Sequence, residues 1–203
     1  MPSISYAITA CNEHVELERL LNQLTEYIRP EDEIVVQMDI TATDEVKDVV
    51  NKYKLTNYFH PLNKDFASFK NNLKGLCTKD YIFQIDADEY LSHNLMFYIP
   101  YILDENPVVE MFSVPRINTV EDLTEQHIKQ WGWNVNDKGW INYPDYQNRI
   151  LKNIPTIQWI NKVHEKLVGA MVTAYLPPSS DFELIHPKTI DRQEKQNAYY
   201  NTI

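Results

Sequence analysis

Three acidic residues that stand close together are the residues of this sequence best suited to bind a ligand or take part in a reaction. Asp86, Asp88 and Glu89 follow Tyr81–Ile85, an apolar run whose length and residue types predict a buried strand. Side chains two apart on an extended chain point to the same side, so we expect Asp86 and Asp88 to share one target. At the carboxyl end of a strand, where open α/β sheets bind ligands, two carboxylates suit a divalent cation that carries a phosphate. The simpler alternative is an acidic turn that caps the next helix.

Polar side chains also follow the first two predicted strands. Thr9, Asn12 and Glu13 stand at the end of the first strand, and Asp39 ends the second. Any one of them alone is equally well explained as a helix cap. If the strands are parallel neighbours, however, all of these groups reach the sheet edge that holds the acid cluster.

The elements that must position these groups alternate along the first half of the chain. Strands are predicted over 4–10, 33–38, 57–62 and 81–85, and helices over 13–28 (capped by Asn12), over 44–53 (capped by Thr43) and over 66–76. This order predicts an α/β fold with a mostly parallel central sheet and helices on both faces.

The second half of the chain is less regular. Its patterns predict a helix interrupted or kinked at Pro100 (95–103), a strand (108–115), a long irregular segment (118–144), two strands of a hairpin (146–151 and 156–160) and a polar helix (190–201). We therefore expect a small antiparallel extension of the sheet in the C-terminal half.

Further polar motifs have a structural and a functional interpretation. His164 and Glu165 stand side by side, and His186 ends a short apolar run. A His–Glu neighbour pair is often structural, and a lone His is more often structural than a metal ligand. Lys64 and Lys70 are candidates for holding a phosphate, with solvated lysines as the alternative.

Composition narrows the class of function. A chain of 203 residues fits one domain, and its net charge of −10 argues against binding to nucleic acid or acidic membranes. The four glycines form neither a dinucleotide-binding fingerprint nor a P-loop. The two cysteines have neither metal nor disulfide spacing, and no signal peptide or membrane-spanning run is visible, so we expect a cytoplasmic protein without an integral membrane segment.

In combination, these motifs resemble the family 2 glycosyltransferases, which have the GT-A (Rossmann-like) fold, over about residues 3–200. Ile8–Glu13 is similar to the family's opening strand, Asp39–Asp44 to its second acidic element, and Asp86–Glu89 to its Asp-x-Asp signature. Ile40 stands where a second adjacent acid is usual. Lys70 replaces a common Arg on the third helix, which keeps the charge but loses the planar fork.

The C-terminal half resembles a subgroup that adds sugars to bacterial surface polysaccharides or lipopolysaccharide cores. The similar segments are Arg149–Asn153, Val163–Glu165 and His186. The resemblance implies a single domain over 1–203, with a nucleotide-sugar-binding half (1–90) and an acceptor and catalytic half (91–203).

The activity that the resemblance implies is metal-dependent, inverting transfer of a sugar from a nucleoside diphosphate, with UDP expected, to a hydroxyl of a glycan or glycolipid acceptor. Mn²⁺ or Mg²⁺ would be held by Asp88 and His186, with Asp86 near the ribose or a metal-bound water. Other donor contacts would come from Thr9, Asn12, Glu13, Asp39, Lys70, Ala87 and Arg149.

Glu165 falls where the family places its catalytic base, with Asp145 in reserve and His164 orienting Glu165 or touching the acceptor. The candidates for an acceptor platform are Trp131, Trp133, Trp140 and Trp159, with core packing as an equal alternative for Trp159. Two other interpretations stay open. One is a degenerate sugar-nucleotide or glycan-binding module. The other is a nucleotidyltransferase, although Cys11–Val15 lacks the glycine-rich, basic loop usual there.

Overall fold

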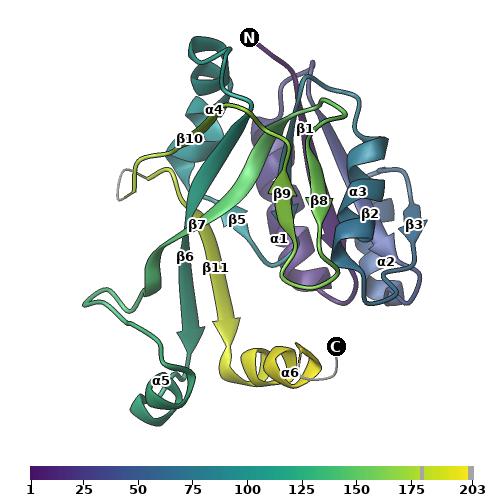
Figure 1. Ribbon diagram of the computed structural model, residues 1–203. Helices are drawn as coiled ribbons and strands as arrows, with labels where there is room; N and C mark the ends of the chain where they lie inside the picture. Colours follow the sequence, from purple (N-terminus) through teal and green to yellow (C-terminus); the bar gives the residue numbers. More distant parts are fainter. Residues whose placement is uncertain (179–180, 201–203) are drawn as a thin grey trace.

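One large mixed sheet runs through the residues described by the computed structural model, 1–178 and 181–200 (Figure 1). Helices cover both of its faces, and a second sheet of two strands packs against it without joining it by strand pairing. In the described part of the chain, no helix has the length and apolar character needed to cross a membrane. The predicted α/β class is confirmed.

The first half of the chain forms the parallel part of this sheet. β1 (Ile4–Ala10) pairs in parallel with β2 (Glu33–Asp39) on one side and β4 (Tyr81–Asp86) on the other, and β3 (Tyr58–His60) pairs outside β2. These strands are the predicted apolar runs, and β1 and β4 are buried over nearly their whole length. Because β1, β2 and β4 run parallel, their carboxyl ends meet at one edge of the sheet.

Three helices connect these strands: α1 (His14–Tyr27), α2 (Asp44–Lys52) and α3 (Phe66–Leu76). The predicted cap of α2 is confirmed, since the Thr43 side chain accepts a hydrogen bond from the Val46 N–H. The prediction that Asn12 caps α1 is wrong. Glu13 is the N-cap residue of α1 and makes no side-chain cap bond, so the local sequence pattern mistook an exposed loop residue for a cap.

Long antiparallel strands extend the sheet in the second half. β7 (Ile141–Lys152) pairs antiparallel with both β4 and β6 (Met111–Glu121), and β11 (Leu184–Thr189) runs parallel to β6 on its far side. Two short strands, β5 (Tyr90–Leu91) and β10 (Thr173–Tyr175), pair with β11 and β6. The predicted antiparallel extension is therefore confirmed, although it is larger than expected.

Two predictions for the strands and loops of the second half need correction. The segments 146–151 and 156–160 do not pair as a hairpin, because the first is the end of β7 and β8 (Gln158–Ile160) pairs instead with β9 (Lys166–Val168). The segment 118–144 is not irregular throughout, since it includes α5 (Glu125–Trp131) and parts of β6 and β7.

The helices of the second half agree better with their predictions. The helix predicted over 95–103 forms as α4 (His93–Glu105), but the predicted interruption at Pro100 is wrong, because α4 continues through that buried residue. The polar helix α6 (Ile190–Tyr200) forms as predicted, and residue 201 lies outside the described residues.

Two clusters of buried side chains hold the layers together. α1, α2 and α4 pack against one face of the sheet, chiefly through leucine, valine and isoleucine side chains. α3 covers the other face together with the β8–β9 hairpin, whose Trp159 and Leu167 are buried there (Figure 1). The backbone of Gly169 passes so close to Thr156 that a Cβ would lie 1.9 Å from the Thr156 carbonyl oxygen, and its φ of +93° also favours glycine. This close contact between Gly169 and Thr156 holds the end of β9 against the segment before β8, next to the hairpin whose loop carries Glu165.

Candidate active site

A cavity of about 570 Å³ opens at the carboxyl ends of β1, β2 and β4, and both halves of the chain line it. Among the predicted site residues, those that line the cavity are Thr9, Glu13, Asp39, Lys70, Asp86, Ala87, Asp88, Trp133, Arg149, Trp159, His164, Glu165 and His186. Those that do not are Asn12, Asp145, Trp131 and Trp140. The predicted convergence of three strand ends on one site is therefore observed.

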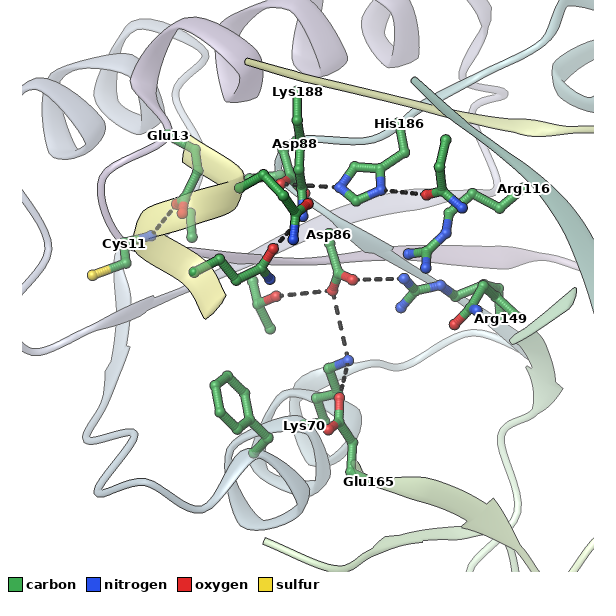
Figure 2. A pocket seen from close by; sticks show the side chains of 18 of the residues that line it. Cys11, Glu13, Lys70, Asp86, Asp88, Arg116, Arg149, Glu165, His186 and Lys188 are labelled. Carbon is green, nitrogen blue, oxygen red and sulfur yellow. Dashed lines mark hydrogen bonds and ion pairs between the residues drawn. The ribbon is translucent and has the colours of Figure 1, made fainter. Parts of the chain in front are cut away.

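Asp86, at the end of β4, is held by three neighbouring side chains (Figure 2). Its carboxylate accepts a 2.6 Å hydrogen bond from Arg149 Nη2, lies 3.6 Å from Lys70 Nζ, and accepts a 3.5 Å bond from Thr9 Oγ1. Burial acts to raise the pKa of Asp86, but the positive charges of Arg149 and Lys70 outweigh it and hold that pKa well below its usual range. Asp86 is thus an ionised carboxylate whose charge is already balanced by cations.

Asp88 faces away from Asp86, toward β11. His186 Nε2 lies 3.2 Å from Asp88 Oδ2, and His186 Nδ1 lies 2.8 Å from Asn118 Oδ1 (Figure 2). Burial acts to raise the pKa of Asp88, but the hydrogen bond and charge of His186 outweigh it and lower that pKa to about 2. Asp86 and Asp88 have different side-chain partners, because β4 ends at Asp86 and Asp88 lies in the turn beyond, where strand alternation no longer applies. Both line the cavity, and their sharing of one bound target stays a prediction.

A buried ion-pair network lies behind the two aspartates. Glu89, whose side chain is 0% exposed, accepts hydrogen bonds from Arg116 at 2.8 Å and from Arg149 at 2.7 Å. Asp145 pairs with Arg116 at 2.7 Å, and its two oxygens also accept bonds from the Asn118 and Gln147 side chains. Sequence reasoning missed Arg116, because only the pairing of β6 with β7 turns it toward the acids.

Asp39 and Glu13 shape the rim of the cavity in the first half. Asp39 accepts hydrogen bonds from the backbone N–H of Thr41 at 2.8 Å and of Leu62 at 2.6 Å. Glu13 accepts one from the Cys11 N–H at 2.8 Å. Burial acts to raise the pKa of Asp39, but a hydrogen bond from the Thr41 hydroxyl and the two backbone bonds outweigh it and lower that pKa. Both carboxylates therefore hold backbone loops in place at the edge of the sheet.

Glu165 lies on the loop between β8 and β9, on the opposite side of Asp86 from Asp88 (Figure 2). Lys70 Nζ contacts Glu165 Oε1 at 2.7 Å and lies 4.7 Å from the centre of the Trp159 ring. Lys70 is nearly buried, with 8% of its side chain exposed, so it ties α3 to the hairpin loop between the two carboxylates Asp86 and Glu165. His164, next to Glu165, also lines the cavity.

The four tryptophans occupy different environments. Trp133 lines the cavity, and its ring packs on Trp131 with a centroid distance of 4.6 Å. Trp140 packs against Tyr143 at 4.7 Å, outside the cavity lining. Trp159 is 7% exposed and belongs to the core cluster beneath α3. Trp133, with Trp131 behind it, is therefore best placed to meet a bound ring.

Asp88 and His186 fit a divalent cation that keeps several ligands from outside the protein. Carboxylate oxygen suits Mg²⁺ and Mn²⁺, and imidazole nitrogen is a common ligand of transition metals. With His186 Nδ1 against Asn118, Nε2 is the ring atom directed at Asp88. Among the described residues, no group of three or more His, Cys, Asp or Glu is placed to hold a metal. The pair therefore suits a cation completed by phosphate oxygens or water.

A family comparison agrees with this architecture. The sequence profile described as "Glycosyl transferase family 2" matches residues 5–164, which include the three strand ends and reach the His164 loop. β11 and α6 lie beyond the matched segment. No curated protein matches the chain.

Solved structures with a similar fold include two of TarS from S. aureus. TarS 1–349 has a TM-score of 0.64 at 14% identity, with 91% of this chain and 60% of that chain covered. TarS 1–349 in complex with UDP-GlcNAc has a TM-score of 0.63 at 15% identity, with 92% and 58% covered. This chain therefore spans about 60% of the length of the TarS chain that it matches.

A third similar structure is glucosyl-3-phosphoglycerate synthase from Mycobacterium tuberculosis in complex with Mg²⁺ and UDP. Its TM-score is 0.50 at 13% identity, and 75% of this chain and 57% of that chain are covered. At such low identity, these similarities concern the fold.

Proposed function

We propose that this chain, which belongs to glycosyltransferase family 2, transfers a sugar with inversion from a UDP-sugar to a hydroxyl of a glycan or glycolipid. The observation that carries the proposal is the placement of Asp88 and His186, 3.2 Å apart, on one side of the strand-end cavity, with Glu165 on the other. UDP is the expected nucleotide because similar folds have been solved with UDP-GlcNAc and with UDP. We assign residues 1–90 to the nucleotide sugar and 91–203 to the acceptor and catalysis.

On the donor side, the rim formed by Thr9, Glu13 and Asp39 would border the nucleoside. Asp88 and His186 would hold Mn²⁺ or Mg²⁺, which supplies Lewis-acid stabilisation of the charge on the leaving nucleotide. Asp86 is neutralised by Arg149 and Lys70, so it can accept hydrogen bonds from ribose without adding net negative charge beside a diphosphate. These residues bind and orient the donor.

On the acceptor side, Glu165 would act as the general base. Inversion requires a carboxylate to take the proton of the acceptor hydroxyl while its oxygen attacks the anomeric carbon opposite the leaving nucleotide. Glu165 lines the cavity, and its contact with Lys70 fixes its orientation. Asp145 is less suited to this role, because both of its oxygens accept hydrogen bonds within the ion-pair network and it does not line the cavity.

A donor screen tests the proposal. The protein is mixed with UDP-, GDP- and dTDP-sugars, with Mn²⁺ or with EDTA, and its melting temperature and the release of nucleotide in the presence of glycan acceptors are measured. We expect a UDP-sugar to raise the melting temperature selectively, and only with Mn²⁺, by mass action. Nucleotide release that is unaffected by EDTA, or no stabilisation by any nucleotide sugar, would contradict the proposal. Stabilisation without turnover for any acceptor would instead favour a binding module.

A further inference from the structure

Arg192, in the first turn of α6, does not itself line the cavity but contacts two carboxylates that do. Its guanidinium lies 3.3 Å from Glu13 Oε1 and 3.6 Å from Asp88 Oδ2, and it also pairs with Glu16 at the start of α1. Figure 2 shows the yellow ribbon of α6 running beside Glu13, with Lys188 of β11 close to Asp88. One arginine of the C-terminal helix thus joins α1 to the carboxylate proposed to hold the cation.

Three other cations near the acids, Lys70, Arg116 and Arg149, are firmly committed to carboxylates, whereas Lys188, which lines the cavity close to Asp88, donates a hydrogen bond to Gln196. Lys70 contacts Glu165 at 2.7 Å, and Arg149 contacts both Asp86 and Glu89 within 2.7 Å. Arg116 and Arg149 are both tied to the fully buried Glu89. Moving Arg116 or Arg149 would leave the fully buried Glu89 without a partner, and moving Lys70 would break its contact with the partly buried Glu165, so none of them can readily move to a diphosphate.

Arg192 differs from these cations in its exposure and in its contacts. Its side chain is 29% exposed, and its distances to the two carboxylates that line the cavity are 3.3 and 3.6 Å, longer than those of the buried pairs. Glu16, its remaining partner, does not line the cavity. These contacts are half-buried, and those to Glu13 and Asp88 are long, so a change of partner there costs less than breaking a contact to the fully buried Glu89.

Arg192 and a divalent cation compete for the Asp88 carboxylate. A cation bound to Asp88 would repel the guanidinium, whose charge has the same sign. The planar fork of a displaced arginine matches the oxygens of a diphosphate, and the contact of Glu16 with Arg192 Nη1 would leave Nη2 available for them. Arg192 can therefore contact Asp88 before the cation and donor bind, and contact the diphosphate after they have bound.

We propose that Arg192 binds the donor diphosphate and reaches it by exchanging Asp88 for the phosphate oxygens when donor and cation enter. This inference rests on the proposed function for the identity of the donor. It gives α6, which lies beyond the segment that matches the family, a direct part in donor binding.

The test compares Arg192→Gln with Lys195→Gln, which removes the same charge from an exposed position on the same helix. Binding of Mn²⁺ alone is followed by electron paramagnetic resonance, and binding of UDP and of uridine at saturating Mn²⁺ by calorimetry. We expect Arg192→Gln to bind Mn²⁺ more tightly, because Asp88 has lost its competitor, and to bind UDP about tenfold more weakly. Uridine binding should be unchanged, and Lys195→Gln should behave like the wild type in all three titrations.

The opposite signs of the two effects separate this role from a structural one. If Arg192 only packs α6 in place, Mn²⁺ and UDP binding will weaken together in Arg192→Gln, and that result overturns the inference. Unchanged binding of both ligands overturns it as well. If the wild type binds neither UDP nor GDP, the proposed function fails. The Mn²⁺ titration then still decides whether Arg192 and a cation compete for Asp88.

Discussion

The two halves of the sheet, joined where β4 pairs with β7, bring their functional groups to the cavity in different ways. In the parallel half, Thr9, Asp39 and Asp86 meet because β1, β2 and β4 end at one edge. In the second half, Glu165 stands on a hairpin loop and His186 on a strand paired with β6, and both are held by long-range contacts. The groups of the first half are therefore placed by the ends of parallel strands, and those of the second half by ion pairs and hydrogen bonds, so substitutions in the two halves should have different effects.

The largest effect is expected on the catalytic side, at the proposed base. Glu165→Gln keeps the shape of the side chain but cannot take a proton, so we expect the transfer rate to fall by about 10²–10⁴-fold while UDP-sugar binding is retained. Single-turnover kinetics and donor titration measure the two separately. Asp145→Asn is the comparison. If a folded Asp145→Asn protein loses as much activity as Glu165→Gln, the base has been assigned to the wrong carboxylate.

The junction between the halves should be the most sensitive point for stability. Arg149→Met leaves Asp86 and Glu89 without their 2.6 and 2.7 Å partner, so we expect the free energy of unfolding to fall by about 3–5 kcal/mol in urea denaturation. Arg19→Met removes an exposed arginine that lies over the Tyr90 ring and should cost less than about 1 kcal/mol. Similar losses for both variants would mean that the buried network does not hold the halves together.

A smaller effect is expected for the acceptor. Trp133→Ala removes a ring from the cavity wall, so we expect KM for the acceptor to rise about 3–10-fold with unchanged donor binding. Trp140→Ala removes a ring of the same size outside the cavity lining and should leave KM within about twofold of the wild type. The acceptor site would have to be placed elsewhere if Trp140→Ala proved the more damaging change.

The smallest effect is expected on stability, when a helix cap is removed from each half in turn. Thr43→Ala removes the cap of α2, which packs on the core, and should lower global stability by about 1 kcal/mol. Thr124→Ala removes the cap of α5, which buries none of its residues, so only local fraying is expected, visible by hydrogen exchange without a shift in the unfolding midpoint. Equal shifts in midpoint would show that α5 is part of the cooperative core.

The same contrast between the halves explains which elements could be predicted from the sequence. β1 and the cap at Thr43 follow from local signals, namely an apolar run and a cap residue before an apolar face. α5 was missed within the segment 118–144, although Thr124 and Gly132 are ordinary start and stop signals; Gly132 takes the left-handed conformation at the end of the helix.

For the candidate site, too, local sequence identifies residues but not the partners that lie far away along the chain. Local sequence singled out Asp86 and Asp88 as acids that follow an apolar run, and His164 and Glu165 as a neighbouring pair, whereas the expected role of Glu165 came from the family resemblance. It could not show that Asp86 and Asp88 face different partners, since that depends on where β4 ends. Nor could it show the roles of Arg116 and Arg192, whose partners lie far away in sequence and are brought close by the pairing of β6 and the packing of α6.

The most direct test of the account is whether UDP binding depends on a cation held by Asp88. UDP is titrated by calorimetry into the wild type and Asp88→Asn, each with Mn²⁺ and with EDTA, and Asp44→Asn on α2 serves as an exposed control. We predict that EDTA weakens binding to the wild type and to Asp44→Asn by at least about tenfold, and that Asp88→Asn binds weakly in both conditions. Tight binding of UDP to Asp88→Asn that still responds to Mn²⁺ would contradict the account.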